Sequence, residues 1–307
     1  MKNNDAALIR RISDLRQRKK AIILAHNYQL PEVQDIADFV GDSLELSQKA
    51  ATTDAAVIVF CGVHFMAETA SILCPDRIVL LPDINAGCPM ANMITAAHLR
   101  KKKEELPDVP VICYINSSAE VKAESDVCCT SANAAQMVNS VDSSTVIFVP
   151  DKYLGLYVST KTEKEIILWQ GYCPTHARIL PEHIIARKKE FPQAKVVVHP
   201  ECPPGVIALA DAVLSTSGII RYAHETEAPQ VIVGTETGII HRLKKDSPAK
   251  QFIPASDQAI CPDMKRITLG KIWQSLEDMS PQVTVPEAIR IKAKAAVDRM
   301  LSTGKRN

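Results

Sequence analysis

Several features that would assign a chain to a familiar class are missing from this sequence. The longest strongly apolar stretch, residues 55–63, is far shorter than the roughly 20 residues that a membrane-spanning helix needs. Residues 1–11 contain no apolar core of a signal peptide. The formal net charge is only +1, without a long run of lysine and arginine. We therefore expect a cytoplasmic protein that binds neither membrane nor nucleic acid.

A low-complexity linker is also missing, and the chain instead repeats itself three times. In each repeat a strand-like run ends in a polar pair spaced i, i+2, then a hydroxyl, then a Cys-Pro dipeptide. The pairs are His26/Tyr28, Tyr114/Asn116 and His199/Glu201, the hydroxyls are Ser43, Ser131 and Thr216, and the thiols are Cys88, Cys173 and Cys261. The hydroxyl lies 17 residues after the first member of the pair in every repeat. If the repeats pack around a pseudo-threefold axis, the three thiols converge on one point.

The order of elements within a repeat predicts an α/β fold, because each reads as helix, strand, loop and helix, strand, helix, strand. We place the repeats at residues 1–92, 93–177 and 178–264. A helical tail, residues 265–307, should pack back on the body because its apolar residues have helical spacing. About 85 residues is small for an independent core, so the repeats should share interfaces.

The nine cysteines require an explanation of their own. An odd number in a chain without a signal peptide argues against a disulfide framework. Cys61 and Cys113 lie in apolar runs and fit buried apolar residues. A structural zinc site often uses CxxC pairs, and the sequence has none. The three repeated thiols fit a [4Fe–4S] cluster with one iron open to act as a Lewis acid, and His176 is the only other nearby candidate ligand.

The hydroxyls and polar pairs suggest a binding site. Each hydroxyl precedes a predicted helix, where it is either an ordinary N-cap or part of a helix N-terminus that attracts anions. The polar pairs project from strand ends, where open parallel sheets bind ligands. Histidine, glutamate and tyrosine side chains can transfer protons when their pKa values are tuned. The pattern predicts a cavity for a small, strongly anionic substrate.

Longer motifs resemble a known family. They are ILAHNYQLPEVQDIADFVGDSLELS (23–47), FMAETASIL (65–73), CPMAN (88–92), YINSSAE (114–120), TSANA (130–134), CPTH (173–176), HPEC (199–202) and GTETGIIHRLKK (234–245). In order and over nearly the whole chain, they resemble quinolinate synthases. The resemblance implies three αβα domains with parallel sheets around a pseudo-threefold axis. It also implies a [4Fe–4S] cluster held by Cys88, Cys173 and Cys261.

The resemblance further implies a reaction in NAD biosynthesis. Iminosuccinate and dihydroxyacetone phosphate condense to quinolinate, phosphate and water, which makes the enzyme a transferase. By motif match the dicarboxylate-binding positions are His26, Ser43, Tyr114, Asn116, Ser131, His199, Glu201 and Thr216. Tyr28 matches a tyrosine that handles the triose phosphate, and Tyr28, Glu201 and His26 are the candidates for proton transfer. An aspartate oxidase or dehydrogenase that makes iminosuccinate is a candidate partner.

The segment around Cys261 departs from longer members of the family, because it lacks their additional cysteines. We therefore expect no thiol switch there. Three alternatives to the enzyme remain open. A non-enzymatic iron–sulfur carrier would need the thiols but not the six polar strand-end residues. A cluster-free dicarboxylate-binding protein would need the hydroxyls and polar pairs but not three Cys-Pro sites, and a zinc protein is the third alternative.

Overall fold

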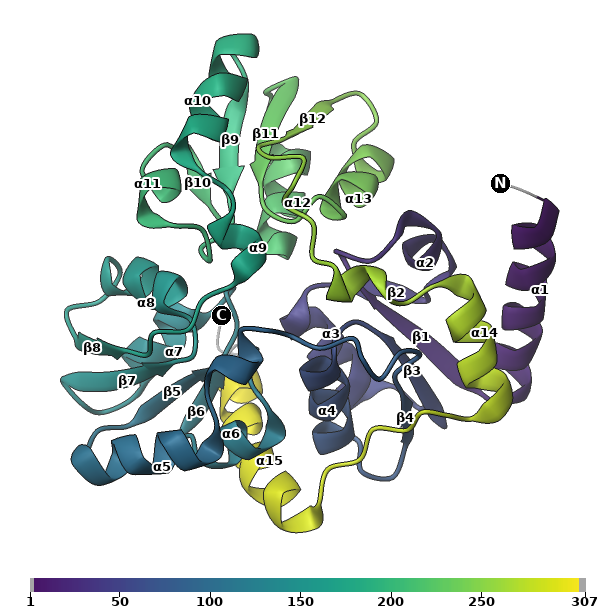
Figure 1. The fold of residues 1–307 in the computed structure, drawn as a ribbon, viewed down its shortest axis with the longest axis horizontal. Helices are drawn as coiled ribbons and strands as arrows, with labels where there is room; N and C mark the ends of the chain where they lie inside the picture. Colours follow the sequence, from purple (N-terminus) through teal and green to yellow (C-terminus); the bar gives the residue numbers. More distant parts are fainter. Residues whose placement is uncertain (1–2, 304–307) are drawn as a thin grey trace.

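Three parallel β-sheets of four strands each make up the fold, which confirms the predicted α/β class with three similar αβα units. The computed structural model describes residues 3–303. Figure 1 shows the three sheets grouped around a common centre, with helices packed along them. Within residues 3–303, no helix has both the length and the apolar character needed to cross a membrane.

The three sheets share one strand order, with the second strand at one edge and the fourth at the other. The first sheet contains β1 (Ala21–His26), β2 (Phe39–Gly41), β3 (Val57–Cys61) and β4 (Ile78–Leu80) in the order β2-β1-β3-β4. The second contains β5 (Val111–Tyr114), β6 (Val127–Cys129), β7 (Thr145–Val149) and β8 (Glu165–Leu168) in the order β6-β5-β7-β8. The third contains β9 (Lys195–Val198), β10 (Ala212–Val213), β11 (Gln230–Gly234) and β12 (Gln251–Pro254) in the order β10-β9-β11-β12.

Helices connect the parallel strands within each unit, as parallel pairing requires. In the first unit they are α1 (Asn3–Arg18), α2 (Pro31–Ile36), α3 (Ser43–Thr52), α4 (His64–Leu73) and the short 3₁₀ turn η1 (Ala91–Met93). The second unit has α5 (Ala96–Glu105), α6 (Ala119–Ala123), α7 (Ala134–Ser140), α8 (Lys152–Ser159) and α9 (Pro174–Ala177). The third has α10 (Pro181–Glu190), α11 (Pro204–Ile207), α12 (Thr216–Glu225), α13 (Ile239–Asp246) and the 3₁₀ turn η2 (Asp263–Lys265).

The residues of the central strands explain why these segments form buried strands. β3 reads VIVFC and is buried throughout, as expected for a β-branched strand covered on both faces. The edge strands β2, β6 and β10 were not predicted, because the sequence indicated only three strands in each unit. They are two or three residues long. Such short runs carry no readable period of hydrophobicity.

A repeated aspartate ties each edge strand to the strand beside it. Its carboxylate accepts a hydrogen bond of 2.8 Å from a backbone N–H in or at the start of the neighbouring first strand. The pairs are Asp38 with Ile23, Asp126 with Val111, and Asp211 with Val196. Each aspartate lies 15 residues after its partner, which is also the register offset between the two strands. The internal repeat is therefore preserved in hydrogen bonds as well as in topology.

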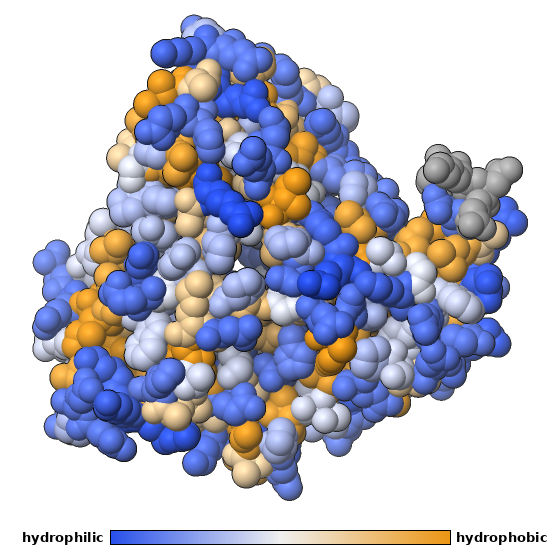
Figure 2. Space-filling view, in the orientation of Figure 1, coloured by the Kyte–Doolittle hydropathy of each residue, from blue (hydrophilic) through white to orange (hydrophobic). Residues whose placement is uncertain are grey.

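The C-terminal segment packs back along the first two units. α14 (Leu269–Asp278) lies against α1, and α15 (Glu287–Thr303) lies against α6, β6 and α4 (Figure 1). Ile272 and Leu276 of α14 are fully buried, as are Ala293 and Met300 of α15. The face of the molecule in Figure 2 is mostly hydrophilic, with hydrophobic side chains in small separate groups.

Candidate functional site

The polar pairs lie where the first strand of each sheet ends. β1 ends at His26 and β5 ends at Tyr114, whereas His199 follows β9 by one residue. The second member of each pair lies in the following loop, so the pair straddles the strand end. His26 and Tyr114 lie directly beside the last residues of the edge strands β2 and β6.

The three hydroxyls follow the edge strands. Ser43 and Ser131 come two residues after β2 and β6, and Thr216 comes three residues after β10. Ser43 and Thr216 are not the N-caps of α3 and α12, because the preceding Asp42 and Ser215 accept the capping hydrogen bonds. The ordinary N-cap explanation is therefore wrong for these two hydroxyls, which remain available for a ligand.

The three repeated thiols follow the fourth strand of each sheet. Each Cys-Pro comes directly before or at the start of a short helical turn, η1, α9 or η2. Pro174 is the first residue of α9, where its missing N–H leaves no hydrogen bond unmade. Burial raises the pKa of Cys88 to about 12 and raises the pKa values of Cys173 and Cys261 as well. Backbone N–H groups two or three residues on act in the opposite direction at all three sulfurs. These N–H groups are donors that would stabilise thiolates bound to a metal.

All twelve side chains predicted for the site line one cavity of about 180 Å³. They come from all three units, so no single unit contains the site. Other parts of the wall are apolar, including Phe65 and Met66, and Arg178 contributes a cation. The individual roles of the twelve side chains remain predictions at this point.

One group of donors in the cavity could hold a metal ion. Within residues 3–303, Cys173, His176 and Glu201 are the only three metal-type side chains whose ligand atoms all lie within 4.8 Å of one another. The three repeated thiols are spaced more widely than that. A zinc ion with Zn–S bonds of about 2.3 Å would bring its sulfurs to within roughly 4 Å of one another. The arrangement therefore disfavours a single zinc ion held by the three thiols.

A chain of hydrogen bonds joins two of the proton-transfer candidates through the cavity wall. The hydroxyl of Tyr28 lies 2.5 Å from Thr235 Oγ1, which lies 2.8 Å from Nε2 of His176. Nδ1 of His176 is 2.8 Å from Oε2 of Glu201, and Oε1 of Glu201 accepts a 2.5 Å hydrogen bond from Tyr114. Both ring nitrogens of His176 thus have partners, which favours a relay over a fourth ligand.

Two histidines are held as neutral hydrogen-bond donors. Nδ1 of His26 accepts a hydrogen bond from the backbone N–H of Tyr28, and Nδ1 of His199 accepts one from the backbone N–H of Glu201. The proton of each neutral ring therefore resides on Nε2. Burial lowers the pKa of both histidines to about 3, although the nearby Glu201 carboxylate acts in the opposite direction. Neutral Nε2–H groups suit carboxylate binding, whereas they leave His26 no free lone pair on Nε2 for accepting a proton.

Glu201 is the ionised centre of the site. Burial alone would raise its pKa, but His176, His199 and the hydrogen bond from Tyr114 lower it below the ordinary range. Nδ2 of Asn116 also donates to Glu201, at 3.4 Å. Oδ1 of Asn116 is buried and has no hydrogen-bond partner among the described residues. This oxygen can therefore accept a hydrogen bond from a donor group on a ligand.

Sequence reasoning missed Thr235 entirely and considered His176 only as a metal ligand. The GTETG motif that contains Thr235 was noticed, but no repeat-related position drew attention to this hydroxyl. The joining of Thr235 to Tyr28 depends on how the third unit packs against the first, which no local pattern reveals.

The buried neutral histidines predict sensitivity to acid. Between about pH 6.5 and 3, the unfolded chain binds a proton at His199 that the folded protein does not, so the free energy of unfolding falls as pH falls. The loss is about 1.4 kcal/mol per pH unit for one such histidine. His199→Gln should reduce the slope of unfolding free energy against pH by about this amount. Denaturant unfolding at a series of pH values measures it, and equal slopes would refute the assignment.

Together the fold and the cavity define a class: an internally repeated α/β protein whose three units share one site built from thiols, hydroxyls and buried proton donors. Residues 10–302 match the family described as "Quinolinate synthetase A protein". The chain belongs to this family.

Named relatives extend across almost the whole chain. A quinolinate synthase of Dehalococcoides mccartyi (strain CBDB1) is 61% identical over 291 residues, which cover 95% of this chain and 96% of the relative. One from Geotalea uraniireducens (strain Rf4) is 56% identical over 291 residues, with coverage of 95% and 96%. One from Methanosarcina barkeri (strain Fusaro / DSM 804) is 54% identical over 297 residues, with coverage of 97% and 98%.

Proposed function

We propose that this protein is a quinolinate synthase of NAD biosynthesis, which condenses iminosuccinate with dihydroxyacetone phosphate to quinolinate, phosphate and water. The observation that carries the proposal is the single cavity lined by all three thiols, all three hydroxyls and all three polar pairs. The near full-length similarity to proteins named quinolinate synthase supports it.

The proposed cofactor is a [4Fe–4S] cluster held by Cys88, Cys173 and Cys261. The donor set fits, because three widely spaced thiols border one cavity and each sulfur faces backbone N–H groups. An iron without a protein ligand would supply Lewis-acid polarisation of a substrate oxygen.

The dicarboxylate is proposed to bind where the donors converge. The Nε2–H group of His26 and the hydroxyls of Ser43, Ser131 and Thr216 line the same cavity, and Nε2 of His199 donates to Ser131. These uncharged donors can hydrogen-bond carboxylates without the cost of burying a second charge. The unpaired Oδ1 of Asn116 would accept a hydrogen bond from a substrate N–H or O–H.

Proton transfer is proposed to run through Glu201 and Tyr28. The ionised Glu201 carboxylate can accept a proton from an acidic substrate group, and Tyr28 can donate one toward the departing oxygens of the triose phosphate. The chain through Thr235 and His176 connects these two groups, so the proton that Tyr28 gives up can be replaced by the one that Glu201 takes up. His26 acts as a hydrogen-bond donor rather than as a base.

Two further parts of the proposal concern the cell. An aspartate oxidase or dehydrogenase would supply iminosuccinate, and the reaction would take place in the cytoplasm. Neither nucleic acid nor membrane takes part in the proposed reaction.

Anaerobic turnover tests the proposal. Protein purified without oxygen should form quinolinate when iminosuccinate and dihydroxyacetone phosphate are both present, and none when either is omitted. Mass spectrometry of the product provides the measurement. A protein with a normal iron–sulfur absorption but no turnover would be a carrier, and one that binds dicarboxylates without iron would be a binding protein.

A further inference from the structure

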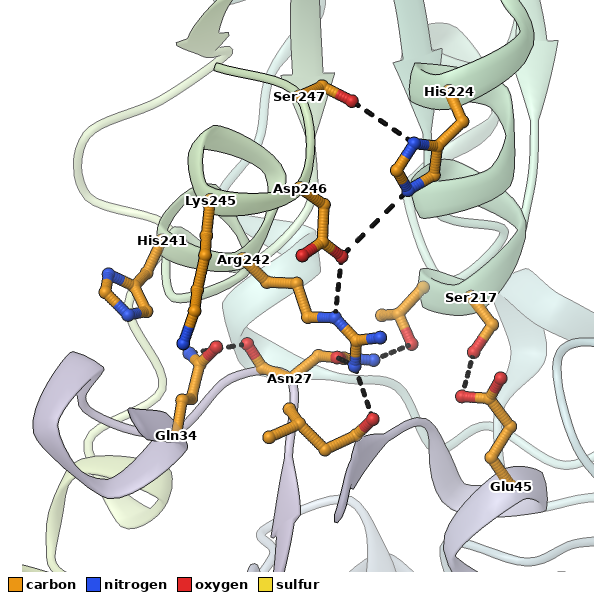
Figure 3. A network of polar contacts seen from close by, with 12 residues as sticks. Asn27, Gln34, Glu45, Ser217, His224, His241, Arg242, Lys245, Asp246 and Ser247 are labelled. Atoms are coloured by element: carbon orange, nitrogen blue, oxygen red, sulfur yellow. Dashed lines mark hydrogen bonds and ion pairs between the residues drawn. The ribbon is translucent and has the colours of Figure 1, made fainter. Parts of the chain in front are cut away.

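The first and third units meet in a polar network beside the cavity (Figure 3). Arg242 on α13 reaches from the third unit into the first, where its Nη1 donates to the backbone carbonyl of Val40 and, at 3.4 Å, to Oδ1 of Asn27. Asp246 holds the guanidinium from the other side, with Nε of Arg242 at 3.0 Å from its Oδ2. Figure 3 shows Arg242 lying between Asp246 and Asn27.

Asn27 is fully buried, and its neighbours in the sequence, His26 and Tyr28, both line the cavity. Its Nδ2 donates a 3.3 Å hydrogen bond to Oγ1 of Thr216 across the interface. A guanidinium can only donate, so Arg242 requires the amide oxygen of Asn27 on its own side. The amide nitrogen must then face Thr216, and the orientation of Asn27 is fixed by chemistry rather than by packing alone.

This orientation determines what the hydroxyl of Thr216 can do. The oxygen already accepts from Asn27, so its own proton is left to donate to another group. Thr216 lines the cavity, and the N-cap role on α12 belongs to Ser215. The remaining direction for the Thr216 proton is toward a ligand in the cavity.

The same device occurs once more around the centre. His199 carries its proton on Nε2, which lies 3.1 Å from Oγ of Ser131 in the second unit. Ser131 therefore also accepts from a neighbouring unit and has its proton left for the cavity. The hydroxyl oxygens of Thr216 and Ser131 thus both accept a hydrogen bond from a residue of another unit, and each keeps its own proton for donation into the cavity.

We infer that Arg242 and Asn27 form a positioning relay that makes Thr216 a hydrogen-bond donor to a carboxylate group in the cavity. The inference deepens the proposed function and rests on it, because the carboxylate belongs to the proposed dicarboxylate. Neither Arg242 nor Asn27 touches the ligand in this arrangement. Each acts through the next residue, across the interface between two units.

Asn27→Asp tests the relay. A carboxylate at this position still pairs with Arg242, so the interface contact is kept or strengthened, but it accepts from Thr216 instead of donating to it. The Thr216 proton would turn away from the cavity. We expect quinolinate to bind about tenfold to one-hundredfold more weakly, as measured by anaerobic calorimetry, while the thermal unfolding temperature does not fall. The KM for dihydroxyacetone phosphate should change little.

A double-mutant cycle separates the relay from simple repulsion by the new charge. Thr216→Val should weaken quinolinate binding by about tenfold or more in the wild-type background but by little in the Asn27→Asp background. Repulsion alone would leave the cost of Thr216→Val the same in both backgrounds, and that result would overturn the relay. If Asn27→Asp does not fold, Arg242→Gln provides the test, since a freely turning amide should weaken binding by about threefold to tenfold.

Asp35→Asn is the matched control. Asp35 accepts from His241 and Lys245 of α13 across the same interface, at 3.0 Å and 2.8 Å, and its hydrogen bonds in the described part of the chain do not include Asn27. It should leave quinolinate binding unchanged, and a loss equal to that of Asn27→Asp would assign both effects to the interface and overturn the relay. Absence of quinolinate binding by the wild type would overturn the proposed function itself.

Discussion

Cys173→Ala should abolish the broad visible absorption of the anaerobically prepared protein, together with quinolinate formation. Cys173 supplies one of three thiols that border the cavity, and the described residues offer no spare thiol beside it. A cluster in which one iron already lacks a protein ligand would be held by only two thiolates after this change. Visible absorption and iron content measure the effect, and Cys88→Ala and Cys261→Ala should behave in the same way.

The buried thiols outside the cavity provide the controls. Cys61 and Cys202 are fully buried and do not line the cavity. Cys61→Ala and Cys202→Ala should keep both the absorption and the iron content. A normal cluster in Cys173→Ala, or its loss in both control variants, would contradict the assignment.

Glu201→Gln should keep the fold and the cluster but lower the rate of quinolinate formation by about 10²–10⁴-fold, as expected for loss of a general acid–base group. The amide has nearly the same volume as the carboxylate, and Tyr114 can still donate to its oxygen. It cannot accept a proton from the substrate. Tyr28→Phe should lower the rate by a similar factor, because it removes the other end of the hydrogen-bond chain.

Steady-state turnover measures the rate of quinolinate formation in both variants. Visible absorption checks that the cluster is retained. Tyr157→Phe is a suitable control, because the Tyr157 hydroxyl contacts the backbone oxygen of Val213 and does not line the cavity. It should keep nearly full activity. Near-wild-type rates in both Glu201→Gln and Tyr28→Phe would show that the acid–base candidates are wrong.

The sequence was sufficient for the repeat and for the twelve predicted side chains that line the cavity, because these recur at nearly constant offsets. His26, Tyr114 and His199 are 88 and 85 residues apart, and a spacing that recurs is visible without any structure. The edge strands escaped notice because β10, for example, has only two residues. The repeated aspartates that hold these strands were equally visible in the sequence but carry no obvious chemistry.

Contacts between units were beyond sequence reasoning. The bond between Asn27 and Thr216 joins residues 189 positions apart, and that between Tyr28 and Thr235 joins residues 207 positions apart. Neither bond recurs between the other units of the described chain, so repetition gives no clue to it. Domain limits at 92, 177 and 264 also remain predictions, since the shared interfaces blur any sharp boundary.

The chain of hydrogen bonds from Tyr28 to Tyr114 has a consequence for how such a site could arise. Three identical subunits in a symmetric ring could supply three thiols and three hydroxyls, since each subunit needs to give only one of each. They could not supply this chain of five side chains. Tyr28 and Glu201, for example, occupy the same position of the repeat but are different residues, whereas identical subunits would have one residue there. A change made in an identical ring is made three times. Joining the units in one polypeptide lets each copy diverge, so that a symmetric cage for a cofactor can hold an asymmetric path for protons.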